Sequence, residues 1–352
     1  MARILCFCHN SDRVQYCSSY QNNKSSNEIF TQGGVFSKAS SCYNPLFFDS
    51  VATELEKYQP TLAVFSTEND IVTGTYFHSD FLPVQMKQYG YKLLTRDKYI
   101  ADDQTNGIRL SIYIPNNENS ISSVQLSKGL IFNDNKYQCD KIYLGVPRAM
   151  VIYVQTTFGL FAFINVLVSR GYPNNDRTIC MSGMMKKFVE GKNIDQLFIC
   201  GDMSNEFKIS NAKLIDYDYI DSARQQDIPA GFEEDLPLVN NNNGGPPKEA
   251  FPLKNHQKFV VPTYSPSYTN RYVRALDAEQ TYQELSKADP QGSTLIGYHD
   301  RIFHKTIRGY PIHCLLYTAI LGDPMLSNPN PNVARQRNHL GILGVYDVEF
   351  DH

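Results

Sequence analysis

The 352-residue chain has no tryptophan, little net charge and no long uninterrupted hydrophobic segment. Its formal net charge of −3 and pI near 6.2 exclude the strongly basic composition typical of extensive nonspecific DNA binding, although a local basic patch stays open. The longest apolar stretch, Ala149–Val168, is interrupted by Gln-Thr-Thr and by Asn165, so we interpret it as two strands and not as a membrane span. Met1–Cys8 is too short for a signal peptide, and no internal repeat is evident.

The cysteines also lack the paired spacing that marks zinc sites. They stand at positions 6, 8, 17, 42, 139, 180, 200 and 314. Cys6 and Cys8 share a strand-like run in which alternate side chains point the same way, and Cys200 lies inside another apolar run. We therefore expect mostly reduced, buried thiols, which are typical of an intracellular, cytoplasmic protein.

What the chain does contain is a series of short apolar runs separated by turn-forming residues. These runs predict strands at the following positions: Ala2–Cys8, Leu62–Phe65, Tyr91–Leu94, Ile108–Ile114, Leu130–Phe132, Ala149–Val154, Phe158–Val168, Leu197–Cys200, Phe259–Tyr264, Gly297–His304 and His339–Phe350. Helical spacing predicts helices at Asp49–Gln59, Phe81–Gly90 and Thr178–Glu190. The mixture predicts an α/β (α+β) fold: a four-layer α/β/β/α sandwich of two packed mixed sheets flanked by helices.

We expect residues 1–352 to form a single domain. Its composition changes at about residues 222–255, where runs of Asn, Gly and Pro predict a flexible surface insertion. This tract interrupts the domain without clearly dividing it in two.

One segment, Asp195–Phe207, organises the functional interpretation. An apolar run ends in Gly201-Asp202, which predicts a buried strand that delivers a carboxylate to the rim of a sheet, where glycine allows a sharp turn. A carboxylate in that position can be a metal ligand, a general base or an ordinary turn residue. All three interpretations stay open from this segment alone.

Further motifs, in a fixed order along the chain, resemble those of a known family. GDMSNEF resembles Gly-Asp-Leu-Asn-Tyr-Arg, VVPTYS resembles Pro-Thr-Tyr-Lys, GYHDRIF resembles Trp-Cys-Asp-Arg-Ile-Leu, and RNHLGIL resembles Ser-Asp-His. Arg148–Gly171 resembles the stretch that runs through Asn-Ser-His-Leu. Together they resemble the endonuclease/exonuclease/phosphatase superfamily, most of all its inositol polyphosphate 5-phosphatases, over most of the chain.

This resemblance implies a Mg²⁺-dependent phosphoester hydrolase. Glu68 would bind the Mg²⁺, a hard ion that prefers oxygen ligands. Asp202 would orient or deprotonate the attacking water, His339 would contact the phosphate or transfer a proton, and Asp300 would fix the His339 tautomer. The resemblance also implies that Arg301 supports the Asp300 segment or binds a phosphate of the substrate. Asn10 and Asn205 would contact the substrate.

Five motif positions depart from the family pattern, and they leave other functions open. Where the family has Asn, His, Asn, Lys and Asp, this chain has Cys8, Leu167, Ser204, Ser265 and Asn338. Asn10 and Asn205 lie close enough in sequence to replace the two missing asparagines. Loss of one such group lowers a reaction rate by about 10²–10³-fold.

Three functional hypotheses follow. The chain is a hydrolase of a phosphorylated small molecule or lipid headgroup, or a catalytically inactive member of the fold that binds protein partners in a larger assembly. The third hypothesis is a nuclease acting on DNA or RNA, which the charge of the chain does not favour.

Overall fold

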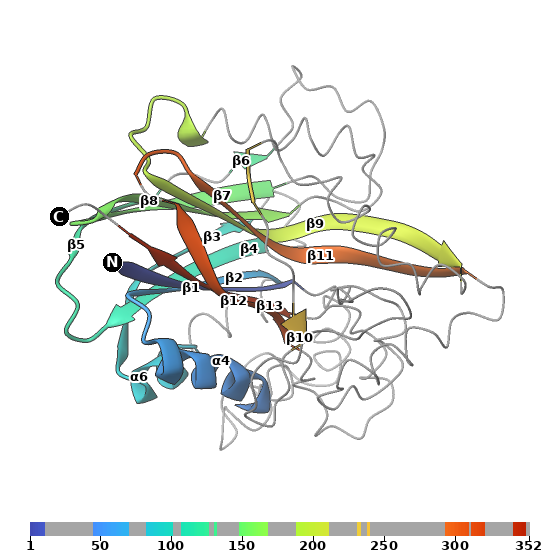
Figure 1. Ribbon diagram of the computed structural model, residues 1–352, viewed down its shortest axis with the longest axis horizontal. Helices are drawn as coiled ribbons and strands as arrows, with labels where there is room; N and C mark the ends of the chain where they lie inside the picture. The colour runs from blue at the N-terminus through green and yellow to red at the C-terminus, as the bar shows by residue number, and fades with distance from the viewer. Residues whose placement is uncertain are drawn as a thin grey trace.

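Two β-sheets lie face to face in the computed structural model of this chain, and helices α4 and α6 cover the outer face of one sheet (Figure 1). The structure describes residues 1–10, 45–69, 82–100, 107–126, 130–131, 148–167, 188–210, 231–233, 238–239, 293–309, 311–320 and 341–349. The prediction of two packed mixed sheets is confirmed. In the described ranges, helices of more than one turn lie against the seven-stranded sheet alone.

The seven-stranded sheet has the strand order β10-β12-β13-β1-β2-β4-β3. Strand β1 pairs in parallel with β2 and antiparallel with β13, so this sheet is mixed. The strands are β1 (Ala2–Asn10), β2 (Leu62–Asn69), β3 (Tyr91–Ile100), β4 (Gly107–Pro115), β10 (Leu238–Val239), β12 (Ile312–Ile320) and β13 (Gly341–Val348).

The six-stranded sheet has the order β11-β9-β8-β7-β5, with β6 paired to β7 beside this path. Its strands are β5 (Ile121–Leu126), β6 (Leu130–Ile131), β7 (Arg148–Thr156), β8 (Gly159–Leu167), β9 (Gln196–Ser210) and β11 (Ser293–Thr306). The long apolar stretch thus forms the β7–β8 hairpin, as predicted. Among the described residues, no helix has the length and apolar character needed to cross a membrane.

Three apolar clusters hold these layers together. The largest fills the space between the sheets, because alternate residues of each strand face inward, including Ile4, Cys6 and Cys8 on β1. A second lies under α4 (Pro45–Tyr58) and α6 (Leu82–Gln88), which correspond to two predicted helices. The third covers the outer face of the six-stranded sheet and includes Phe188, the first described residue of the predicted helix Thr178–Glu190.

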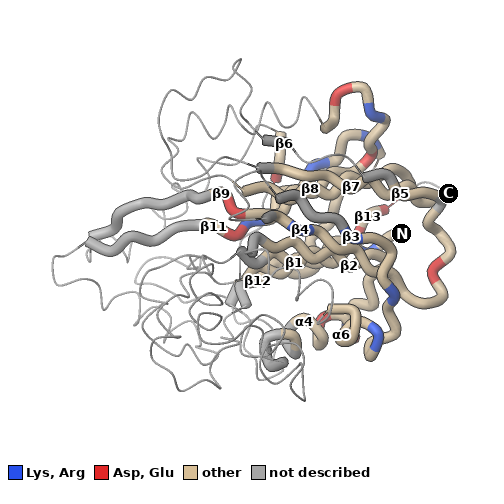
Figure 2. The backbone as a smooth tube through the Cα atoms, turned by 180° about the vertical axis from the view of Figure 1, so that it is seen from behind, with Lys and Arg blue, Asp and Glu red and all other residues tan. Residues whose placement is uncertain are grey.

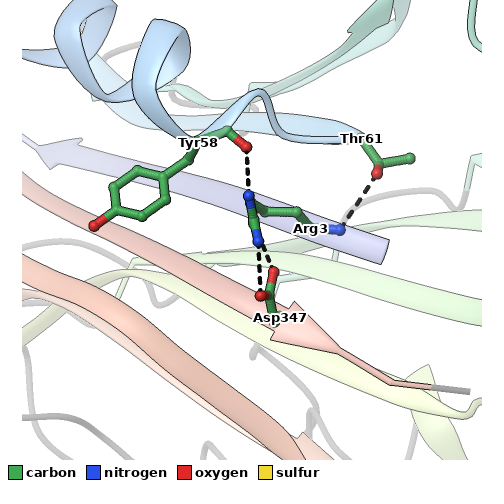
Figure 3. A network of polar contacts seen from close by, with 4 residues as sticks. All are labelled: Arg3, Tyr58, Thr61 and Asp347. Atoms are coloured by element: carbon green, nitrogen blue, oxygen red, sulfur yellow. Dashed lines mark hydrogen bonds and ion pairs between the residues drawn. The ribbon is translucent and has the colours of Figure 1, made fainter. Parts of the chain in front are cut away.

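An ion pair ties strands β1 and β13 to the end of helix α4 (Figure 3). Arg3 Nε lies 2.6 Å from Asp347 Oδ1, and its second nitrogen donates to Oδ2 at 2.8 Å. Another Arg3 nitrogen donates to the carbonyl oxygen of Tyr58 at 2.9 Å, in the last turn of α4. The bidentate ion pair with Asp347 raises the pKa of Arg3 above its ordinary value. The hydrogen bond to the Tyr58 carbonyl oxygen fixes the end of α4 against the sheet.

The prediction that the chain turns at Gly201-Asp202 is wrong. Strand β9 continues through both residues to Ser210, and its pairing with β8 ends at Asp202. Gly201 does not adopt a left-handed φ angle. A Cβ atom there would overlap the Val166 carbonyl oxygen and lie 2.8 Å from the Val166 carbonyl carbon and amide nitrogen. Glycine is therefore required by the close approach of β8 and β9, and not by a turn.

Some predictions fall outside the described residues. They are the strand at Phe259–Tyr264, the residues His339, Ser265 and Asn338, and all of the 222–255 insertion except residues 231–233 and 238–239. The single-domain organisation also stays a prediction.

Candidate active site

The candidate site lies where the parallel pairings of both sheets, β1 with β2 and β8 with β9, come to their ends. On the seven-stranded sheet, Asn10 of β1 is the register partner of Glu68 of β2, and Glu68 also pairs with Ile108 of β4. On the facing sheet, β8 and β9 are parallel, and their pairing ends with Leu167 beside Asp202. Ligands of α/β proteins commonly bind at such strand ends.

Asp202 and Asp300 form a cross-strand pair at this place. They are register partners on the antiparallel strands β9 and β11, and Figure 2 shows acidic segments side by side on these strands. Asp202 is 4% exposed and Asp300 is fully buried. Two carboxylates brought together away from water repel each other unless protons, cations or donors stabilise them, so the pair is a chemically demanding arrangement. Asp300 lies within strand β11, which contains the predicted strand Gly297–His304.

Cys8 approaches Asp300 from the other sheet. Its Sγ atom lies 4.0 Å from Asp300 Oδ1, in donor orientation. Burial raises the pKa of the Cys8 thiol well above its ordinary value, and the charges of Asp300, Cys200 and Asp202 raise it further. Cys8 is thus a neutral thiol near pH 7, and it stands where the resemblance would place an asparagine.

His299 approaches the other carboxylate. Its Nδ1 atom lies 3.6 Å from Asp202 Oδ1, and the two side chains are 0% and 5% exposed. Sequence reasoning missed His299, because it lies inside the motif that pointed to Asp300. A histidine directly before a motif aspartate was the available signal.

A β-bulge separates Asp202 from Asn205. Asp300 pairs with Asp202 and Tyr298 pairs with Asn205, so two residues of β9, Met203 and Ser204, stand opposite the single residue His299. The register therefore shifts by one residue. Asn205 now holds a pairing position that Ser204 would hold in a regular ladder.

Leu167 and Arg301 complete the immediate surroundings. Leu167 is 9% exposed and belongs to the central core, so the strand neighbour of Asp202 is an apolar side chain where the family has histidine. Arg301 is fully buried, and its guanidinium carbon lies 4.7 Å from the ring centroid of Phe303, which belongs to the outer cluster of this sheet. The structure thus brings together Asp202 and Asp300. Arg301 follows Asp300 in sequence, but its side chain lies against Phe303.

Asn165 connects the two sheets behind the site, and sequence analysis did not single it out. This buried side chain on β8 donates from Nδ2 to the carbonyl oxygen of Thr67 at 3.1 Å and to that of Arg109 at 2.8 Å. Thr67 directly precedes Glu68. Asn165 therefore holds β2, which carries Glu68, against β8, the strand next to Asp202. The sequence signal for Asn165 was its position in the segment that resembles Asn-Ser-His-Leu.

The donor atoms near the two strand ends decide which metal ion the site could hold. Among the described residues, no group of three or more His, Cys, Asp and Glu side chains is able to hold a metal ion. The nearby donors are carboxylates from two strands, with a neutral thiol and an imidazole, so the oxygen atoms suit Mg²⁺ better than a soft metal ion. The cysteines with described positions, Cys6, Cys8, Cys200 and Cys314, form no disulfide, and the first three are buried.

These buried thiols and phenols predict a loss of stability at alkaline pH. A hydrogen bond with Cys6, together with burial, raises the pKa of Cys200, and burial raises the pKa of Tyr153 to about 12. The unfolded chain releases these protons at lower pH than the folded chain. These groups should therefore not change the free energy of unfolding below their ordinary pKa values, and they should lower it as pH rises from about 9 to 12, by up to about 1.4 kcal/mol per pH unit for each group.

Urea unfolding across this pH range measures the effect. Tyr153→Phe should reduce the slope above about pH 10, because it removes one of these groups. A free energy of unfolding that does not change between about pH 8 and pH 11 would contradict the expectation.

Comparisons with known proteins support the fold. The sequence matches no protein-family model and no curated protein. The inositol polyphosphate 5-phosphatase domain of SpSynaptojanin, solved with inositol (1,4)-bisphosphate and calcium ion, aligns with a TM-score of 0.53 at 12% identity, covering 98% of this chain and 83% of that one. The chain thus has the fold of the endonuclease/exonuclease/phosphatase superfamily, as predicted.

Other structures align with lower scores. D. rerio TDP2 complexed with a single strand DNA product aligns with a TM-score of 0.46 at 11% identity, covering 99% of each chain. The ferrous NO complex of Cimex nitrophorin aligns with a TM-score of 0.47 at 13% identity, covering 98% of this chain and 97% of that one.

Proposed function

We propose that this chain is a phosphoester hydrolase that acts on a phosphorylated small molecule or lipid headgroup. The observation that carries the proposal is the buried register pair of Asp202 and Asp300. Such a pair is costly to fold and is typical of sites where carboxylates perform acid–base work. The paired strand positions of Asn10 and Glu68 lie at the carboxyl ends of β1 and β2, and Cys8 links β1 to Asp300.

In the proposed reaction, Asp202 orients or deprotonates the water that attacks phosphorus. Asp300 fixes the tautomer of His339, which contacts the phosphate or transfers a proton to the leaving group. Chain connectivity supports this pairing. Strand β13 begins at Gly341, shortly after His339, and its next residue, Ile342, is the register partner of Cys8, the neighbour of Asp300.

We further propose that Glu68 holds Mg²⁺. The carboxylate chemistry at the two strand ends fits an ion that takes oxygen ligands and keeps several waters. When bound, Mg²⁺ would neutralise the charge that develops on the phosphoryl oxygens. Asn10, the strand partner of Glu68, is proposed to contact the substrate beside it.

The β-bulge supports a substrate-binding role for Asn205. It shifts the register so that Asn205, and not Ser204, pairs with Tyr298. This pair is the next one in the register after Asp202 and Asp300. Arg301 is proposed to support the Asp300 segment and not to bind phosphate, because it is fully buried against Phe303. The reduced thiols of the described cysteines support an intracellular, cytoplasmic location.

Two neighbours of the carboxylates favour a second candidate, a catalytically inactive member of the fold that serves as a binding subunit of a larger assembly. Cys8 lies against Asp300, and Leu167 pairs with Asp202, where the family has asparagine and histidine. Neither a neutral buried thiol nor an isobutyl group stabilises a developing phosphoryl charge as those residues do.

Hydrolysis assays distinguish the two candidates. Purified protein is incubated with Mg²⁺ or Mn²⁺ and with soluble inositol phosphates, phosphoinositide vesicles, and plain or abasic DNA. An enzyme should hydrolyse an inositol phosphate or phosphoinositide, and Asp202→Asn should lower kcat by about 10²–10⁴-fold. His339→Ala should lower it as well, and preferred cleavage of DNA would instead support the nuclease hypothesis.

Asp195→Asn is the matched control, because it makes the same chemical change next to strand β9. Asp195 accepts a hydrogen bond from the Leu160 amide at 2.7 Å and pairs with Arg308 at 3.2 Å, outside the site. It should leave kcat within about twofold of the wild-type value. Turnover that survives Asp202→Asn contradicts the proposed role, and absence of turnover on every substrate, with no metal binding by calorimetry, favours the binding subunit.

A further inference from the structure

We propose that His299 is a positioning residue that holds the Asp202 carboxylate in the orientation needed for water attack. This inference rests on the proposed hydrolase function and adds a residue to it. Where the resembling motif has cysteine, this chain has His299. The proposed role is therefore specific to this chain and is not implied by the family motif.

The two side chains lie next to each other, slightly beyond hydrogen-bond distance, and away from water. His299 Nδ1 is 3.6 Å from Asp202 Oδ1, and neither side chain is more than 5% exposed. An imidazole next to a carboxylate interacts more strongly here than at the protein surface, because bulk water does not screen the contact. Since Oδ1 faces His299, the contact orients the carboxylate, and Oδ2 is the oxygen assigned to take the proton of the attacking water.

The β-bulge gives His299 its place. Met203 and Ser204 of β9 together stand opposite His299, so the ladder is interrupted at this residue and is regular again at Asp300. Bulges of this kind re-aim side chains and are common beside active sites. The same irregularity thus places His299 next to Asp202 and moves Asn205 by one register position.

A second buried histidine on the same strand shows what a core role looks like. His304 is 3% exposed. The centroid of its ring lies 5.1 Å from that of the Tyr346 ring and 6.4 Å from that of the Phe198 ring. His304 packs among aromatic rings, whereas His299 faces a carboxylate. The two carboxylates of the site also differ, because Asp300 has Cys8 beside it and Asp202 has His299.

Kinetic comparison of three variants tests the inference. His299→Leu keeps an apolar side chain in the buried space and removes the imidazole, so kcat should fall about 10–100-fold while KM stays within about threefold. In His299→Asn the side-chain amide nitrogen reproduces the position of Nδ1, so kcat should stay within about fivefold of the wild-type value. His304→Leu, the matched control, should lower the melting temperature and leave kcat unchanged.

Histidine NMR provides a second readout that does not depend on turnover. With ¹⁵N-labelled histidine, the His299 ring signals are assigned by their loss in His299→Asn. They should shift in Asp202→Asn, because the carboxylate next to Nδ1 becomes an amide, and they should not shift in Asp195→Asn. If His299→Leu does not fold, His299→Gln replaces it, because glutamine places its amide nitrogen near Nε2 and should not preserve kcat.

The possible results separate this inference from the proposed function. A loss of kcat in His299→Leu, recovery in His299→Asn and the NMR shift together support it. Wild-type turnover with unchanged kcat in His299→Leu overturns the positioning role and leaves the hydrolase proposal intact, and unshifted His299 signals in Asp202→Asn also overturn it. Absence of wild-type turnover on every substrate overturns the hydrolase proposal and this role together, and a retained NMR shift then shows a contact without catalysis.

Discussion

Gly201→Ala is expected to prevent strands β8 and β9 from pairing, or to lower the free energy of unfolding by more than about 4 kcal/mol. The added methyl group would overlap the Val166 carbonyl oxygen and lie 2.8 Å from two other backbone atoms of Val166. A flexible side chain could move away, but these atoms belong to β8, which β7 and β9 hold on both sides. The strands would have to separate next to Asp202.

Urea unfolding, followed by circular dichroism, measures this effect. Gly90→Ala is the control, because Gly90 has a φ angle of +80° and a methyl group added there would meet no atom within 4 Å. It should cost only the left-handed backbone strain of about 1–2 kcal/mol. Equal stability of Gly201→Ala and the wild type would show that β8 and β9 are not as close as the structure indicates.

Asn165→Asp should lower the free energy of unfolding at neutral pH by about 3–5 kcal/mol, although it changes the shape of the side chain very little. The Asn165 amide nitrogen donates to the carbonyl oxygens of Thr67 and Arg109, at 3.1 and 2.8 Å. A carboxylate has no proton to donate and would repel both oxygens in a fully buried position.

The effect should depend on pH in a defined direction. Burial and the two carbonyl oxygens would raise the folded-state pKa of the introduced carboxyl above its unfolded value of about 4. The variant should therefore be most stable below about pH 4, relative to wild type at the same pH, and should lose stability as pH rises toward 7. Asn116→Asp, in an exposed turn, should change stability by less than about 0.5 kcal/mol, and an equal effect of both variants would contradict the bridging role of Asn165.

Continuous apolar runs predicted the inner strands well, because a strand buried on both faces has few polar residues. This applies to β1, β2, β7 and β8, and the helical spacing also located α4 and α6. Strands β5 and β12 were not predicted. In β5, exposed Ser123 alternates with half-buried Val124, and in β12, His313 and Leu315 are exposed, so neither strand has an unbroken inward-facing run.

The site was predicted in part, for a similar reason. The order of motifs brought Asp202 and Asp300 together, and the structure places them on neighbouring strands in direct register. The turn at Gly201 was wrong because a glycine after an apolar run is typical of a turn, whereas close packing of two strands leaves no mark in the local sequence. His299 and Asn165 each stand in a motif segment, but their contacts could not be predicted, since these depend on distant segments: the bulge of Met203 and Ser204 opposite His299, and the carbonyl groups of the facing sheet.

The pairing of β1 with β13 has a consequence for folding. Strand β1 lies in the middle of the seven-stranded sheet, yet Arg3 and its partner Asp347 are 344 positions apart in sequence. During synthesis, β1 has no β13 to pair with until the long segment between the two strands has been made. Such high contact order slows folding and leaves the Ile4–Cys8 edge open to other strands in the meantime. Pairing of β1 with β13 is therefore expected to be a late step in the folding of this sheet.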